Sequence, residues 1–152
     1  MPRILCAALF TLSLAGQAAD RQLVEGKIAV TRFGARFEAA GEFLIQDGPN
    51  LVPLQVAAGK LLTLRQVTAT CTLSSGARMN FWTVRASGES TTHHYLPMKH
   101  SDSEFAGVWI SLERVQIPAR AGARPVATFQ RSSSYGFNDA CVGSWTGYFT
   151  NE

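Results

Sequence analysis

The sequence has few charged residues and no segment of biased composition. The first absence concerns whether the chain folds, and the second concerns how many domains it forms. Charged residues make up 16% of the 152 residues, whereas hydrophobic residues make up 46%. A disordered chain has the opposite balance, so this composition predicts a folded protein with a core. The 13 glycines and 6 prolines are scattered. With no linker and no internal repeat, we expect a single domain.

Motifs that carry catalysis or hold a cofactor are also missing. The chain has no Gly-x-Ser-x-Gly, no His-Glu-x-x-His and no glycine-rich phosphate loop. Ser132–Ser134 lies near Asp139, and Glu104 and Glu113 are the best carboxylate pair for glycoside hydrolysis. Nothing in the sequence brings either set into catalytic geometry. We therefore predict no enzymatic activity and no cofactor, with a small secreted hydrolase as a lesser alternative.

The first nineteen residues have the layout of a cleavable signal peptide. Arg3 supplies a positive start, Ile4–Ala15 is apolar, and small residues follow at Gly16–Ala19. The apolar run is too short to span a bilayer stably, and no later segment reaches the ~20 apolar residues of a membrane helix. We expect a signal peptide at 1–19, a mature domain at 20–152, and a secreted or periplasmic location.

Removal of that segment would leave two cysteines, Cys71 and Cys141. Neither lies in a Cys-x-x-Cys or Cys-His motif, and an exported protein meets oxidising conditions. One intramolecular pairing is possible, so we predict a disulfide between them. In the chain-entropy model this bridge contributes roughly 4 kcal/mol.

The basic residues give no sign of a nucleic-acid surface. The predicted mature chain holds ten arginines and three lysines, spread along its length. Nucleic-acid binding requires clustered basic residues among exposed aromatic ones. We interpret the arginines as solvated surface charge: Arg21, Arg32, Arg36, Arg65, Arg78, Arg85, Arg114, Arg120, Arg124 and Arg131.

Short strands and turns account for nearly all of the chain after residue 20. Asp47–Asn50 and Ala57–Lys60 are predicted turns. Roughly eight to ten strands are expected, with no long amphipathic helix, which favours an antiparallel β-sandwich resembling a jelly roll. A closed β-barrel is the alternative fold.

The predicted strand over Leu61–Leu73 contains an irregularity. Leu62 and Leu64 share one face by period-2 geometry, whereas Val67, Ala69 and Cys71 share the other. Either a bulge near Arg65–Gln66 brings both sets to the same core, or the strand is buried on both faces; we expect the bulge. The strand over Gly107–Ile117 shows a similar change between Leu112 and Val115.

All three histidines lie close together, at positions 93, 94 and 100. His93 and His94 are adjacent on a predicted strand and point to opposite faces, so they cannot both bind one ion. We predict no metal site. His94, His100 and Asp102 are the residues that would form one if the polar Lys99–Phe105 loop folded back.

Aromatic and loop residues provide the possible ligand contacts. Trp145 shares a face with Cys141 and Phe149 and is predicted to lie in the core. Tyr135 and Asn138 lie in the polar loop Ser132–Asp139, and Tyr95 and Trp109 are further aromatic residues that could contact a ligand. Loops on a rigid sandwich scaffold commonly carry specificity.

Two segments resemble small uncharacterised exported β-sandwich proteins of bacteria. Val56–Leu64 is similar to their Pro-Ala-Gly turn and following strand, with Ala57 in place of the proline. Ser144–Phe149 is similar to their Ser-Gly-Tyr-Leu ending, with Thr146 in place of the serine. The resemblance implies fold and export and brings no activity with it.

These observations predict an exported, non-enzymatic module that binds a protein or surface partner through the loops at the ends of the sandwich. A carbohydrate-binding module is the first alternative, and the second is the small hydrolase or a metal-binding protein. The expected partner is therefore an unknown protein or glycan.

Overall fold

The computed structural model describes residues 21–74, 76–86, 92–101, 107–133 and 136–152. The predicted signal peptide lies outside the described residues. The strands within these ranges are β1 (Gln22–Arg32), β2 (Glu38–Asp47), β3 (Asn50–Pro53), β4 (Lys60–Thr72), β5 (Met79–Ala86), β6 (His93–Leu96), β7 (Lys99–His100), β8 (Val108–Ala119), β9 (Pro125–Arg131) and β10 (Ala140–Asn151). Among the described residues, no helix is both long and apolar enough to cross a membrane.

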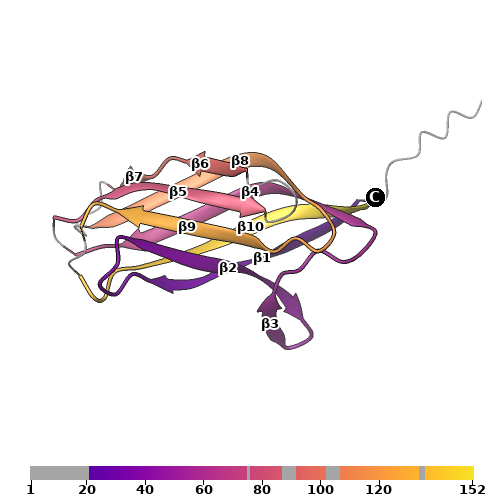
Figure 1. Ribbon diagram of the computed structural model, residues 1–152, viewed down its shortest axis with the longest axis horizontal. Helices are drawn as coiled ribbons and strands as arrows, with labels where there is room; N and C mark the ends of the chain where they lie inside the picture. The colour runs from indigo at the N-terminus through magenta and orange to yellow at the C-terminus, as the bar shows by residue number, and fades with distance from the viewer. Residues whose placement is uncertain (1–20, 75, 87–91, 102–106, 134–135) are drawn as a thin grey trace, which may run out of the picture.

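The strands form one antiparallel sheet that curls over into two layers (Figure 1). The strand order is β6-β5-β9-β2-β1-β10-β4-β8-β7, with β3 paired to β2. No ladder in the described chain joins β6 to β7, so the sheet is not closed as a barrel. The predicted antiparallel all-β fold is confirmed.

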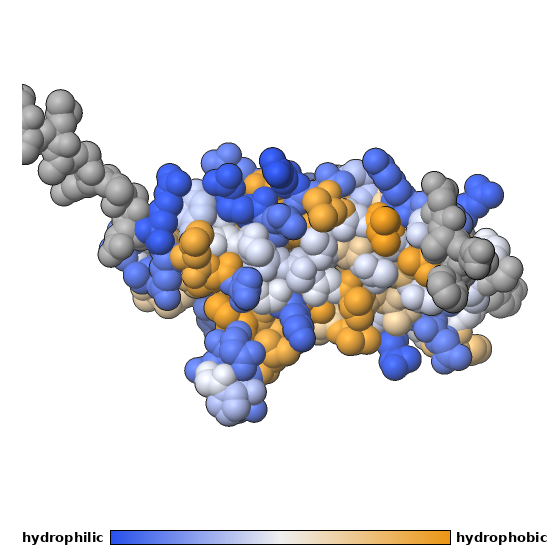
Figure 2. Space-filling view, turned by 180° about the vertical axis from the view of Figure 1, so that it is seen from behind, coloured by the Kyte–Doolittle hydropathy of each residue, from blue (hydrophilic) through white to orange (hydrophobic). Residues whose placement is uncertain are grey.

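Strand β2 belongs to both layers. Its first half, Glu38–Glu42, pairs with β9 in the smaller layer of β6, β5 and β9. Its second half, Phe43–Ile45, pairs with β1 in the larger layer of β1, β10, β4, β8 and β7. From Leu44 onward β2 also pairs with β3, in a hairpin that projects from the body, as Figure 1 and Figure 2 show. The turn of this hairpin is the predicted one at Asp47–Asn50.

The core lies between the layers and is filled mainly by large side chains. Trp82 and Phe129 stack in the smaller layer, with ring centroids 5.4 Å apart. Trp145 comes from the larger layer and is buried, as predicted. A hydrogen bond joins the layers directly, because Trp82 donates its indole Nε1–H to Ser111 Oγ on β8 (3.0 Å).

The predicted bulge in β4 is present. Gln66 pairs with Thr146 and Leu64 pairs with Gly147, so Arg65 is an extra residue in the β4 strand. Leu64 and Val67 therefore both point into the core, where both are fully buried. The bulge places Arg65 and Gln66 together on the outer side of the sheet.

The parity change predicted in β8 leaves Ile110 and Leu112 outside the core, with side chains that are 47% and 66% exposed. They pair with Thr70 and Thr68, which point outward on β4, and this pairing fixes their face. The predicted loop from Lys99 begins instead as strand β7, paired with Trp109 and Ile110; residues 102–106 lie outside the described residues.

A loop platform as the candidate functional site

The predicted disulfide joins β4 to β10 near one end of the two-layered sheet. Cys71 and Cys141 are directly opposite each other on these neighbouring strands, and their bridge spans a separation of 70 residues. Both are fully buried. Three loops meet beyond the bridge: 33–37 between β1 and β2, 73–78 between β4 and β5, and 132–139 between β9 and β10.

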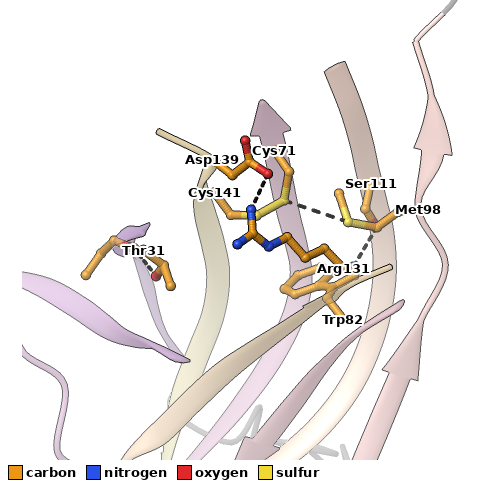
Figure 3. Close-up of a disulfide and its surroundings, with 9 residues drawn as sticks. Thr31, Cys71, Trp82, Met98, Ser111, Arg131, Asp139 and Cys141 are labelled. Atoms are coloured by element: carbon orange, nitrogen blue, oxygen red, sulfur yellow. Dashed lines mark hydrogen bonds and ion pairs between the residues drawn. A yellow bond between two sulfur atoms is a disulfide. The ribbon is translucent and has the colours of Figure 1, made fainter. Parts of the chain in front are cut away.

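Arg131 connects two of these loops. It is the last residue of β9, and its side chain points into the protein (Figure 3). The guanidinium donates to the carbonyl oxygens of Arg36 (3.0 Å) and Gly34 (2.7 Å), and to that of Gly136 (2.9 Å). It also lies over the ring of Phe33, 4.8 Å from the centroid.

Asp139 brings in the third loop. Its carboxylate pairs with Arg131 and accepts hydrogen bonds from the backbone N–H (2.7 Å) and the hydroxyl (3.3 Å) of Ser74. The Phe33 N–H donates to the Asp139 carbonyl (3.1 Å). Side-chain and backbone groups around one buried ion pair therefore hold all three loops, and Figure 3 shows this pair beside the disulfide.

The interpretation of Arg131 as solvated surface charge was wrong. Burial alternates along β9, and Arg131 has the same parity as the buried Ala127 and Phe129. Its inward direction therefore follows from period-2 geometry. Asp139, eight residues later, provides the charge that makes burial of the guanidinium tolerable. Parity and an acidic residue in the next loop are the signals that could have identified the pair.

Two of these loops, 33–37 and 132–139, present exposed residues, which we call the loop platform and define by Arg36, Phe37, Phe137 and Asn138. Phe37 is 54% exposed and Phe137 76% exposed. Arg36 and Asn138 are also exposed. The Phe37 carbonyl accepts the Arg131 backbone N–H (2.9 Å), which fixes the chain directly behind this aromatic side chain.

The other residues predicted to contact a ligand are not brought together. Tyr135 lies outside the described residues. Tyr95 is 69% exposed on β6, where its ring packs edge-on against Phe81 (5.4 Å). Trp109 is half-buried on β8 beside His100 (5.2 Å), and its Nε1 has no hydrogen-bond partner among the described residues. Only Asn138 of the described set joins the platform.

The described residues proposed for a metal site or a hydrolase are not grouped into such a site. His94 is half-buried on β6, His100 is exposed on β7, and Asp102 lies outside the described residues. Within the described ranges no three His, Cys, Asp or Glu side chains are grouped as ion ligands. Asp139 pairs with Arg131, and Ser132 Oγ accepts the Arg78 N–H (3.0 Å).

The chain matches no protein-family model and no curated protein sequence. Among solved structures it is similar to the CBM3a-L domain with flanking linkers from scaffoldin cipA of the cellulosome of Clostridium thermocellum. The alignment covers 88% of this chain and 69% of that chain, with 7% identity and a TM-score of 0.24. A likeness this low carries no inference about a ligand.

Proposed function

We propose that this chain is an exported, non-catalytic binding module whose loop platform takes a protein partner. The observation that carries the proposal is the buried Arg131–Asp139 pair, which fixes three loops beneath the exposed rings of Phe37 and Phe137. Export is proposed from the signal-like sequence at 1–19, and the disulfide suits an oxidising compartment.

Preorganisation is the main physical support for this role. Binding by a loose loop loses affinity because the loop must be ordered on association. Here part of that cost is met on folding, since hydrogen bonds of Arg131 and Asp139 already hold Arg36, Gly136 and Ser74, one residue in each of the three loops. Rigid loops that carry aromatic side chains are typical of specific interfaces.

The chemistry of the platform favours a protein over a sugar. Phe37 and Phe137 have no polar atom on the ring, so a partner gains most by covering them with apolar side chains. Arg36 and Asn138, which are next to Phe37 and Phe137 in the sequence, add exposed hydrogen-bond donors. This arrangement of apolar anchors and polar rim matches protein interfaces.

The test is affinity capture from the native periplasm or medium, with the partner identified and its Kd then measured. The variant Phe37→Ala/Phe137→Ala should weaken binding at least 10-fold, since each lost aromatic anchor costs on the order of 1–2 kcal/mol. A matched control is Leu51→Ala/Leu112→Ala, which removes two exposed apolar side chains elsewhere.

Equal losses in both double variants, or an unchanged Kd in the phenylalanine variant, would refute the platform as the binding surface. Circular dichroism on each variant would show that the fold is retained. Because both pairs are exposed, neither should unfold the protein.

A further inference from the structure

The bulge in β4 creates an unusual group of side chains on the outer side of the larger layer. In a regular strand, residues 65 and 66 would point to opposite faces. Here Leu64 and Val67 both face the core, so Arg65 and Gln66 both face out. Bulges often occur where a protein redirects a side chain towards a ligand.

Two adjoining hollows lie on this outer side, with volumes of about 480 and 470 Å³. Gln116 lines both, so they form one trough across β10, β4 and β8. The first hollow includes Arg21 and Tyr148. The second includes Arg65, Arg114 and Gln66. Figure 2 shows the molecule from behind, and on this face hydrophilic residues (blue) are interspersed with residues of intermediate (white) and high (orange) hydropathy.

The trough is lined by three arginines, and two of them contact the same aromatic ring. The guanidinium carbons of Arg21 and Arg65 lie 4.9 and 5.9 Å from the centroid of the Tyr148 ring. Arg114 lines the same trough. No carboxylate of the described residues lines either hollow. Glu25 is opposite Thr146 on the neighbouring strand β1, on the same face, and lines the next hollow along this face.

These arginines are not used for internal ion pairs. In the described part of the chain, the salt bridge present is that between Arg131 and Asp139. Among the described residues, Arg65 and Arg114 therefore take no part in an ion pair. Neighbouring cations that repel one another gain from binding an anion.

We propose that this trough binds an acidic glycan, through guanidinium contacts to its carboxylate or sulfate groups. Arginine presents a planar fork of donors that matches such anions. Gln66, Gln116 and Thr146 add amide and hydroxyl groups, which can exchange hydrogen bonds with sugar hydroxyls. The trough is open along the sheet, and this form suits a chain better than a small enclosed ligand.

This site is independent of the loop platform. Asp139 and Tyr148 are nine residues apart on or next to β10, which corresponds to roughly 30 Å along an extended strand. One surface can therefore fail a test without affecting the other.

The experiment measures binding of the full chain to polygalacturonate and to dextran sulfate by calorimetry at low and moderate salt. Poly-glutamate and anionic phospholipid vesicles serve as peptide and membrane comparisons, and neutral dextran as the uncharged one. We expect binding to at least one of the two acidic glycans. The variant Arg65→Gln/Arg114→Gln should reduce the affinity at least 10-fold. The control variant Arg32→Gln/Arg78→Gln also removes two positive charges, at exposed positions outside the trough. It should change the affinity by less than 3-fold.

Three outcomes would overturn the inference. The first is no binding to either acidic glycan. The second is an equal loss in both double variants, because that indicates net charge and not a site. The third is binding to poly-glutamate or vesicles as strong as that to the glycans.

The variant Tyr148→Phe, which keeps the ring, should retain at least a third of the affinity.

Discussion

Arg131 and Asp139 form an ion pair inside the protein, with side chains that are 0% and 2% exposed. Both charges are fully committed: the guanidinium to three backbone carbonyls and the carboxylate to Ser74. The pair therefore has a structural role, because it holds the loops that carry the exposed loop platform.

Removing one partner of this pair should be costly. Arg131→Met leaves the Asp139 carboxylate buried without its cation, and we expect a loss of about 3–5 kcal/mol in the free energy of unfolding. Urea denaturation followed by tryptophan fluorescence measures it. The exposed Arg78→Met should cost less than ~0.5 kcal/mol. Similar midpoints for the two variants would contradict the structural role of Arg131.

The disulfide should make a comparable contribution. Cys71→Ala/Cys141→Ala is expected to lower the free energy of unfolding by roughly 4 kcal/mol, because the bridge restricts a loop of 70 residues in the unfolded chain. Urea midpoints with and without reductant provide the measurement. Reductant should shift the midpoint of the wild type and leave that of the double variant in place. A wild type insensitive to reductant in the unfolded state would argue against the bridge.

Gly26 should not tolerate a side chain. A Cβ there would lie 2.0 Å from the Leu44 carbonyl oxygen and 2.7 Å from the indole of Trp145. Gly26→Ala should therefore displace Trp145, weaken its hydrogen bond to Leu44 (3.1 Å) and cost about 2–3 kcal/mol.

The control for Gly26 separates crowding from backbone strain. Gly59 has a φ of 70°, and a Cβ added there would meet no atom within 4 Å, so Gly59→Ala should cost only about 1 kcal/mol. Tryptophan emission should shift in Gly26→Ala and stay unchanged in Gly59→Ala. The reverse order of stabilities would disprove the crowding argument.

Ser111 should matter more than its size suggests. Ser111→Ala leaves the buried Trp82 indole N–H without its acceptor, which should cost about 1–3 kcal/mol. Ser144→Ala is the matched control, since the Ser144 hydroxyl bonds to Thr68 on the exposed side, and should cost less than ~0.5 kcal/mol. Thermal unfolding of both variants compares them directly. Equal melting temperatures would mean that this bond between the layers is unimportant.

Local patterning was sufficient to predict the strands, the turn at Asp47–Asn50, the disulfide and the bulge. In each case the information lies within a few residues: the parity conflict between Leu64 and Val67 has few solutions on a pleated strand. The partner of Cys71 followed because only one other cysteine remains after residue 20.

The errors have a different origin, because they concern contacts set by strand pairing. Ile110 and Leu112 look like core residues in isolation, but their partners Thr70 and Thr68 place them outside. Phe33 is buried, whereas the nearby and equally apolar Phe37 is 54% exposed. The burial of Arg131 depends on loops that are separated by up to 97 residues in the chain.

Strand β2 has a consequence for how this protein comes apart. Because one continuous strand pairs with β9 in one layer and with β1 in the other, the layers cannot slide past each other or detach as separate sheets. Peeling β2 away removes a paired neighbour from β9 in one layer and from β1 in the other. Amide protons in both layers should therefore exchange with solvent in a single cooperative opening.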